Sequence, residues 1–412
     1  MKDVSEQLKD CFYTAVRMNA EINIKDFKEL TEKKAINSFL DISDRNLLLR
    51  IVNGEFNVNQ KTVSRIKKIL DSYNQIQNIA RGYMNTADSL GISIISCNDK
   101  NYPYNWKIQS GMPKVFYARG NQDLLNKMTL NGSVAVVGSR NPSKYSLYAT
   151  EQICKSLGDK GITTVSGMAL GIDRQAHLSS AETPGGTIAV LAGGVDNIYP
   201  PANKDIYQLI CSKGLVISEM PPGQTPIKQY FPSRNRLIAG LTDCTLIMEA
   251  GKMSGTLHTA SFAANQGKEI FVLPNSIYYE NALGGLKILE DGGNILLSPE
   301  SVIDSISHAL MYKRMTMGRK EDFFFRDFEI EEIDNKVDIS VVRELSKVKP
   351  EALDDEQWKI LIKDSLTLKP LCADELCVML SLPFYKISKL LTELELNGTV
   401  CQSKGKYSLT FV

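Results

Sequence analysis

The spacing of apolar residues changes near residue 90 and divides the chain of 412 residues into two regions. Before that point apolar residues recur three or four positions apart, as at Val63, Ile66 and Leu70, which is the period of an amphipathic helix. After it, short continuous apolar runs alternate with stretches of helical length. Such runs are typical of a mostly parallel sheet covered on both faces. We therefore predict a small helical domain over 1–88 and an α/β domain over 89–310.

The apolar runs are the expected strands, at 93–96, 134–137, 163–165, 187–191, 215–218, 245–248, 269–273 and 294–297. The stretches of helical length between them are the expected helices, at 147–160, 173–181, 204–213, 234–241 and 256–266. Many of the strands are followed by glycine, serine or glutamate. Ligands of open α/β sheets bind beyond the carboxyl ends of the strands. We therefore expect the functional chemistry at that edge of the sheet.

Beyond about residue 310 the pattern weakens, and we interpret 311–350 as a linker. The last region, 351–412, is compact again and predicts a winged-helix-like domain, because three helices precede two strands. The three helices are expected at 355–365, 373–380 and 384–397. The third takes the recognition position but offers only Lys386 and Lys389 to DNA. A contact with protein, or simple packing, is therefore at least as good an interpretation of this domain.

Composition limits the classes of function. The formal net charge is +1, so any affinity for nucleic acid must come from a local basic patch. No segment has the length and apolarity of a membrane span or a leader peptide, so we expect no membrane partner. The eight cysteines are scattered and form no CxxC pair, which is typical of reduced thiols in a cytoplasmic protein. We expect neither a metal nor a cofactor.

One glycine-containing turn, Gly138-Ser139-Arg140, follows the second expected strand. A dinucleotide site would need a glycine in place of Arg140 and an acidic residue after the next strand, which instead ends in Ser166-Gly167. The Gly-Lys pairs of the chain also lack the remaining residues of a P-loop. The turn offers backbone N–H groups, a hydroxyl and a guanidinium, which together suit a phosphate. In the alternative interpretation, Gly138 merely permits the turn and Arg140 pairs with a carboxylate.

The segment 228–236 combines cations with aromatic rings. Lys228, Arg234 and Arg236 surround Phe231, and Asn235 adds an amide. A single nucleic-acid strand needs cations for its phosphates and aromatic faces for its bases, and each stacked base contributes about 1–3 kcal/mol. The segment therefore predicts single-strand binding. An ion pair on a helix surface is the alternative role for Arg236.

Two other motifs admit a structural or a functional interpretation. Gly193 and Gly194 open a turn that ends in an aromatic-proline corner, and they either admit a ligand close to the backbone or form a tight loop. Asp173 and His177 lie four residues apart on one expected helix. Since no nucleophile accompanies them, a structural hydrogen bond is the better interpretation of the histidine.

A second expected helix start lies at the same edge of the sheet. Ser254, Gly255 and Thr256 precede or open a helix, whose free N–H groups favour an anion. Glu249 ends the preceding strand and is the one acid there with the chemistry of a general acid or base. Without a partner acid or metal ligands it is a weak candidate for catalysis.

Six motifs occur in an order and spacing that resemble those of the DNA-processing protein A (DprA/Smf) family. They are VAVVGSR, SGMALGIDRQAH, TIAVLAGGVDNIYP, SEMPPGQTP, FPSRNRLIAGL and EAGKMSGTLHTA, and they cover about 90–300. The resemblance implies an extended Rossmann-like domain, flanked by a SAM-like or helix-hairpin-helix-like domain and a winged helix. It also implies a homodimer without enzymatic activity that binds single-stranded DNA and loads the RecA recombinase during natural transformation.

The family's DNA contacts carry over onto Arg140, Lys228 and Phe231. We expect Arg140 and Lys228 to hold phosphates and Phe231 to stack a base. Arg234 and Arg236 would extend the basic rim, and the glycine turns would let the strand approach the backbone. The chain departs from the family at residue 275, where asparagine replaces the usual glycine.

Two other functions remain open from the residues. An enzyme or sensor for a nucleotide or nucleoside phosphate would use the same cleft, with Glu249 as its acid or base, and a specific ligand would stabilise it. Alternatively, the winged helix would be the main DNA reader. Duplex DNA would then be preferred, and removal of the residues after about 350 would abolish binding.

Overall fold

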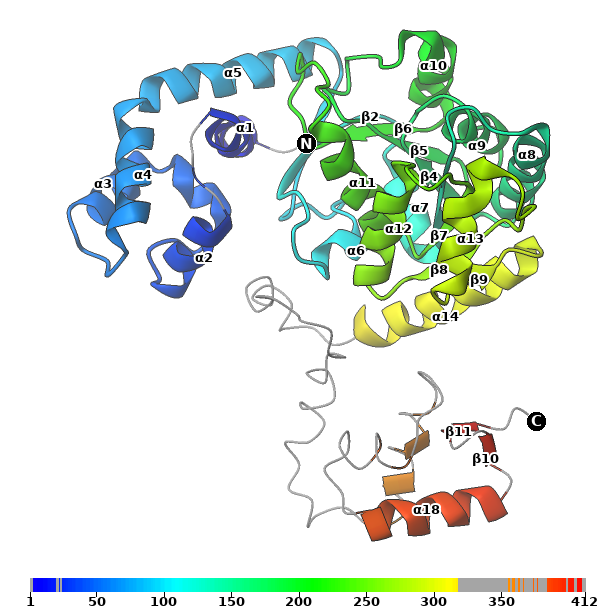
Figure 1. Cartoon of the computed structure of the whole chain (residues 1–412). Coiled ribbons are helices and arrows are strands. Elements are labelled where there is room, and N and C mark those ends of the chain that lie inside the picture. The colour runs from blue at the N-terminus through cyan, green and yellow to red at the C-terminus, as the bar shows by residue number, and fades with distance from the viewer. Residues whose placement is uncertain are drawn as a thin grey trace. The chain divides into compact units, whose positions relative to one another are not determined.

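The fold is described from a computed structural model, which places residues 3–19, 22, 24–317, 355, 358–359, 362–363, 366, 373, 376, 384–397, 399–403 and 406–409. The chain forms two compact units, 1–329 and 330–412, and each has its own hydrophobic core. Figure 1 shows the larger unit as an α/β domain with a group of helices at its N-terminal side. Among the described residues, no helix is both long and apolar enough to cross a membrane.

Nine strands of the described residues form one sheet in the order β1-β2-β6-β5-β4-β3-β7-β8-β9. They are β1 Ser93–Ser96, β2 Val115–Gly120, β3 Ser133–Gly138, β4 Thr163–Ser166, β5 Thr187–Val190, β6 Leu215–Ser218, β7 Cys244–Glu249, β8 Glu269–Val272 and β9 Asn294–Ile295. The strands from β3 to β9 pair in parallel, whereas β2 runs antiparallel to β1 and β6. Strand β3 lies between β4 and β7, so the order of strands reverses there. Such a reversal opens a crevice at the carboxyl ends.

Helices cover both faces of this sheet, as the alternation of its side chains requires. The helices of the domain are α6 Tyr104–Lys107, α7 Asp123–Asn131, α8 Lys144–Asp159, α9 Ile172–Ser180, α10 Lys204–Lys213, α11 Tyr230–Leu241, α12 Thr256–Asn265, α13 Leu283–Glu290 and α14 Pro299–Met317. In β3, Ala135 and Val137 pack in one core with α11 and α12. Val134 and Val136 pack on the opposite face with α8, α9 and α14.

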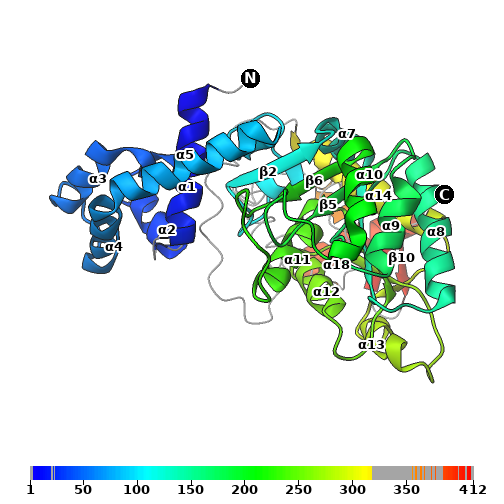
Figure 2. The ribbon, with the colours of Figure 1, turned by 90° about the horizontal axis from the view of Figure 1, so that it is seen from above.

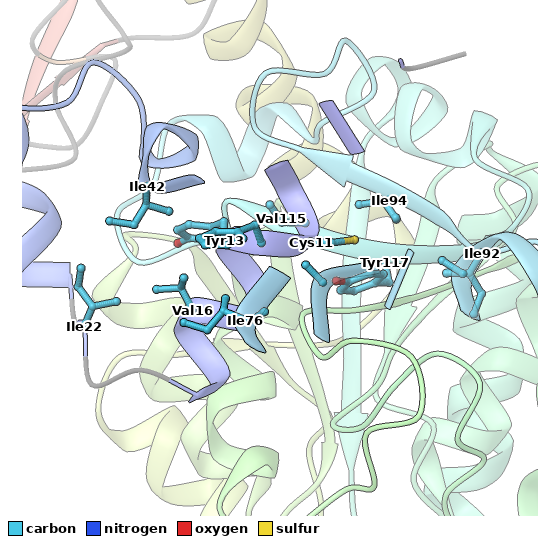
Figure 3. Close-up of a cluster of buried hydrophobic side chains, with 14 of the residues drawn as sticks. Cys11, Tyr13, Val16, Ile22, Ile42, Ile76, Ile92, Ile94, Val115 and Tyr117 are labelled. Carbon is cyan, nitrogen blue, oxygen red and sulfur yellow. The ribbon is translucent and has the colours of Figure 1, made fainter. Parts of the chain in front are cut away.

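The N-terminal helices share a core with the edge of the sheet. They are α1 Val4–Asn19, α2 Ile24–Glu32, α3 Arg45–Val52, α4 Gln60–Asp71 and α5 Tyr73–Ser89, with the 3-10 helix η1 Phe39–Ser43. Figure 2 shows α2, α3 and α4 on one side of α1 and α5, and the sheet on the other. In Figure 3, Cys11 and Tyr13 of α1 lie beside Val115 and Tyr117 of β2 in one buried cluster. The N-terminal helices therefore share their hydrophobic core with the sheet and have no separate core of their own.

The structure adds one strand and moves several expected boundaries. Strand β2 was not predicted from the sequence. Helix α11 begins at Tyr230, four residues before the expected start, and α14 continues to Met317, inside the expected linker. Strand β9 ends at Ile295, two residues before the expected end. The rest of the linker, from 318 to 350, lies outside the described residues.

The smaller unit contains helix α18 Phe384–Leu396 and the antiparallel pair β10 Val400–Ser403 and β11 Lys406–Leu409. Leu390 and Leu394 of α18 are buried together with Trp358. This arrangement agrees with the expected third helix and wing. The two earlier helices, expected at 355–365 and 373–380, fall largely outside the described residues.

Candidate nucleic-acid interface

Two cavities meet at the carboxyl edge of the sheet, where the order of strands reverses. One has a volume of about 320 Å³, and its lining includes Gly138, Phe231 and Thr256. The other has a volume of about 480 Å³, and its lining includes Ser139. Arg140 and Ser254 line both cavities, so the two adjoin there. The loops after β3 and β7 and the start of α11 thus form one hollow, as the sequence predicts.

Arg140 is an exposed cation of this hollow, and the exposed Lys252 also lines the second cavity. Its guanidinium carbon lies 6.0 Å from the centroid of the Phe231 ring, within the range of a cation–π contact. Within the described part of the chain no carboxylate forms an ion pair with Arg140, which argues against the carboxylate-pair alternative. The turn itself is held by α9, because the Ser139 carbonyl accepts a hydrogen bond of 3.1 Å from the backbone N–H of Ile172. The guanidinium is therefore free to meet an anion.

Lys228 lies on an exposed loop just before α11, three residues from Phe231. Two hydrogen bonds to the turn after β5 fix the position of that loop. The backbone N–H of Gly194 donates to the Gln224 carbonyl at 2.8 Å, and the N–H of Gly223 donates to the Asp196 carboxylate at 2.9 Å. The lysine loop is thus tied to the turn after β5.

The glycines of that turn serve this packing. A Cβ on Gly193 would lie 2.8 Å from the Gln224 carbonyl oxygen, closer than real Cβ atoms come to backbone. Both Gly193 and Gly194 are buried, and neither lines the two cavities. The tight-loop interpretation of these glycines therefore fits better than close approach of a ligand.

Arg234 corrects an expectation. It was expected to extend the basic rim, but only 7% of the residue is exposed. Its Nη1 donates to the backbone carbonyls of Gly167 and Val190, which ties α11 to the ends of β4 and β5. Burial lowers the pKa of Arg234 to about 10, although the charge of Asp173 raises it. Arg234 lines the floor of the cavity of about 320 Å³, where the two carbonyls hold its guanidinium and little of its surface is left for a strand.

Ser166, Gly167 and Asp173 belong to the same internal support. The Ser166 hydroxyl donates to the Val136 carbonyl at 2.6 Å, and the backbone N–H of Gly167 donates to the Asp173 carboxylate at 3.1 Å. A Cβ on Gly167 would lie 2.3 Å from Nη1 of Arg234, so only glycine leaves room for the guanidinium. Ser166 and Gly167 line neither cavity. We therefore assign both residues to packing.

Arg236 is also engaged within the protein. Its guanidinium pairs with the carboxylate of Glu219 and donates to the Gly111 carbonyl. Arg236 therefore forms an ion pair, the alternative role considered for it, and this argues against a place on the basic rim. Because Arg17 of α1 pairs with the same carboxylate, Glu219 joins α1 to α11.

Glu249 is enclosed, with 3% of its surface exposed. Its carboxylate accepts hydrogen bonds from the backbone N–H of Ser143 at 3.0 Å and from the Ser143 hydroxyl at 2.8 Å. Ser143 in turn caps α8, since its hydroxyl accepts from the N–H of Ser146. Glu249 thus anchors the loop after β3 and lines neither cavity. This placement argues against its role as an acid or base.

The start of α12 closes the hollow opposite Arg140. Ser254, Gly255 and Thr256 all line a cavity, and the Ser254 hydroxyl accepts from the N–H of Thr256 at 3.2 Å. The Asn235 amide donates to the Gly255 carbonyl at 3.3 Å, which joins α11 to α12. His258 lines the same cavity. It was not among the expected site residues, although it lies only two residues after Thr256.

His177 lies behind the hollow as a structural residue, as expected, but its partner is not Asp173. Its Nδ1 lies 2.7 Å from the Thr187 hydroxyl, and the ring is fully buried. Burial, together with the nearby charge of Arg234, lowers the pKa of His177 to about 3. The imidazole is therefore neutral at ordinary pH.

Comparisons with known proteins agree with each other. Residues 93–307 match the family model described as DNA recombination-mediator protein A, and residues 346–406 match the DprA winged helix domain. Protein Smf of Synechocystis sp. is 33% identical over 315 residues, which cover 75% of this chain and 77% of that protein. DNA processing protein DprA of Bacillus subtilis is 35% identical over 216 residues, or 52% of this chain and 72% of that protein. The X-ray structure of DNA processing protein A from Streptococcus pneumoniae superposes with a TM-score of 0.56 at 29% identity, covering 74% of this chain and 99% of that one.

Proposed function

Because the chain belongs to the DNA recombination-mediator protein A family, we propose that it is a recombination mediator that binds single-stranded DNA in the hollow around Arg140. One observation carries the proposal. Arg140, exposed and without a carboxylate partner in the described residues, lies against the ring of Phe231 at the edge where α/β sheets bind ligands. A cation beside an aromatic ring meets the two needs of a nucleic-acid strand at one point.

Phosphate contacts would come from Arg140 and Lys228, the two expected cations that remain on the surface. Both belong to loops that are fixed by hydrogen bonds of the backbone, so little loop entropy is lost on binding. Each neutralised phosphate releases counterions, and the affinity therefore falls with salt. Two cations give a modest slope, consistent with the small net charge of the chain.

Base contacts would come from the half-exposed ring of Phe231. A stacking face accepts any unpaired base, whereas the bases of a duplex are already stacked on each other. The site therefore favours single strands and shows little sequence preference.

The two alternative functions receive less support. The enzyme alternative needs a reactive Glu249, whose carboxylate is held by Ser143 instead. The winged-helix alternative needs free cations on α18, but Lys389 pairs with Asp355 at 2.8 Å, and Lys386 lies over the Trp358 ring. We therefore propose a protein without catalytic activity, whose main DNA site is the α/β domain.

The finer expectations of the family belong to the same proposal. They are loading of the RecA recombinase, assembly as a homodimer and action in the cytoplasm during uptake of DNA. Family membership is the support for each of them, and no described residue is assigned to a contact with RecA or a second subunit.

Fluorescence anisotropy of a labelled oligo(dT) strand tests the proposal. The full chain is titrated at two salt concentrations, with unlabelled duplex of equal length as competitor. We expect single-strand binding that weakens with salt and that duplex competes poorly. Absence of single-strand binding at low salt would remove the proposed function, and equal competition by duplex would favour the winged helix as the reader.

A further inference from the structure

Tyr199, the aromatic residue of the corner that ends the Gly193-Gly194 turn, contacts Phe231 of the proposed DNA site. The residue is 46% exposed in the loop after β5. Its ring centroid lies 5.6 Å from that of Phe231, and the two ring planes are inclined by 59°. Two adjacent aromatic rings that are both partly exposed leave an apolar surface in contact with water. Such surfaces are unusual outside interaction sites.

Tyr199 has the more open ring of the two. Phe231 is half-buried, and its surroundings already include Arg140 as well as Tyr199. A base that stacks on Phe231 therefore has less of the ring surface to itself, because Arg140 and Tyr199 also contact that ring. The inclination of 59° means that the two rings are not stacked on each other and instead form a corner. Each wall of such a corner can support one base of a strand whose neighbouring bases are splayed apart.

The backbone on both sides of Tyr199 is anchored. Before it, the N–H of Asn197 donates to the Gly194 carbonyl at 2.9 Å. After it, the Asn203 amide donates to the Met168 carbonyl at 2.9 Å. A ring presented from a fixed loop loses little freedom when it binds a ligand, which favours affinity.

We propose that Tyr199 is a further DNA-binding residue, which stacks a second base next to the one on Phe231. The proposal rests on the proposed single-strand binding and deepens it, because it gives the site two adjacent base positions. The recognised chemistry is the face of any unpaired base. The tyrosine hydroxyl is not required, since stacking uses the ring.

Two strands of equal length separate stacking from phosphate binding. One is labelled oligo(dT), and the other is a strand of abasic residues with the same sugar-phosphate backbone. For Tyr199→Leu we expect the affinity for oligo(dT) to fall by about 5- to 100-fold, the range for loss of one stacked base. The affinity for the abasic strand should stay unchanged, because its phosphates do not contact the ring. Tyr199→Phe should bind both strands like the wild type.

Two control variants show whether the effect of Tyr199→Leu is specific to stacking. Lys228→Ala should weaken binding of both strands, because it removes a phosphate contact. Tyr148→Leu removes a 65%-exposed tyrosine of α8 that lines neither cavity, and it should change neither affinity. Thermal unfolding of each variant checks that the fold is kept.

Three results would overturn the proposal. Unchanged oligo(dT) binding by Tyr199→Leu, while Lys228→Ala weakens it, removes Tyr199 and leaves the proposed function standing. If Tyr199→Leu loses the same affinity for oligo(dT) and for the abasic strand, Tyr199 does not stack a base and instead supports the conformation of the loop. If the wild-type protein binds neither strand, the proposed function and the role of Tyr199 fall together.

Discussion

Arg17 and Glu219 are 202 residues apart in the sequence, yet Nη1 of the arginine lies 2.6 Å from a carboxylate oxygen of the glutamate. Arg236 of α11 pairs with the other oxygen. Burial raises the pKa of Glu219, but the charges of Arg236 and Arg17 outweigh it, so the pKa lies below its ordinary value. The carboxylate therefore stays charged and joins the N-terminal helices to the helix that carries Phe231.

Replacement of this carboxylate should destabilise the fold. Glu219→Gln leaves two guanidinium groups without their counter-charge, and loss of one partner of a buried pair costs about 3–5 kcal/mol. We expect a value near the lower end, about 3 kcal/mol, because 38% of the Arg17 side chain is exposed. Urea unfolding measures the change. Asp205→Asn is the control, since it breaks an exposed pair with Arg174 and should have little effect. Equal loss in both variants would contradict the importance of burial.

Lys228→Ala should lower DNA affinity without a change in stability, because the side chain is exposed. Loss of one phosphate contact should reduce the slope of log affinity against log salt by about 0.7 for a single strand. Anisotropy titrations at three or more salt concentrations measure this slope. Lys127→Ala is the matched control, because Lys127 is exposed on α7, which leads into the amino end of β3. The same loss in the control would show only an effect of net charge.

Replacement of two arginines near the proposed DNA site should have opposite effects: one should lower stability and the other should lower DNA affinity. Arg234→Met removes a buried guanidinium that serves two carbonyls and leaves Asp173 without its charge partner. The free energy of unfolding should fall by about 3 kcal/mol or more. Arg140→Ala should change stability by less than about 0.5 kcal/mol, as is usual for surface residues, and should weaken DNA binding. Parallel unfolding and binding curves for the two variants test this. A fully stable Arg234→Met protein would refute the internal role.

His177 should make the fold less stable in mild acid. Its pKa is about 3 in the folded state against an ordinary value of 6.5, so between these values the unfolded chain binds more protons. Stability is therefore lost as the pH falls below 6.5, by up to about 1.4 kcal/mol per pH unit. Urea unfolding between pH 7.5 and 5 should show a shallower slope for His177→Asn. His258→Asn, at an exposed histidine, should keep the wild-type slope. Identical slopes for all three proteins would exclude His177 as the cause.

The sheet was predictable because buried parallel strands are continuous apolar runs, as in β3 and β7. Strand β2 was not predicted, since Val115–Gly120 lies outside the regular alternation of strands and helices and pairs antiparallel to both neighbours. The start of α11 was missed for a local reason. The expected helix began only at 234, after Pro232, but proline is tolerated in the first turn of a helix, where its missing N–H is not needed.

Residue types and motifs were enough to predict which segments form the site, but not which of their side chains are buried. Arg140 and Phe231 line one cavity at the predicted edge, and Lys228 lies on the exposed loop three residues before Phe231. Arg234 and Arg236 have the same charge as the surface cations, and nothing local in the sequence distinguishes an internal arginine from an exposed one. Their partners come from distant segments, such as Glu219 and the carbonyl of Gly167. Tyr199 was missed because its contact with Phe231 also depends on the fold.

The packing of α1 on β2 has a consequence for biosynthesis. Helix α1 is translated before every strand of the sheet, but its apolar face is covered by β2, and its Arg17 finds a partner only after β6 has been made. Contacts so distant in sequence form late, and domains generally acquire their structure as whole units during synthesis. The nascent helix therefore leaves the ribosome with the part of its apolar face that packs on β2 uncovered until about one hundred further residues have been translated. During that interval it is a natural substrate for a chaperone that binds exposed apolar segments.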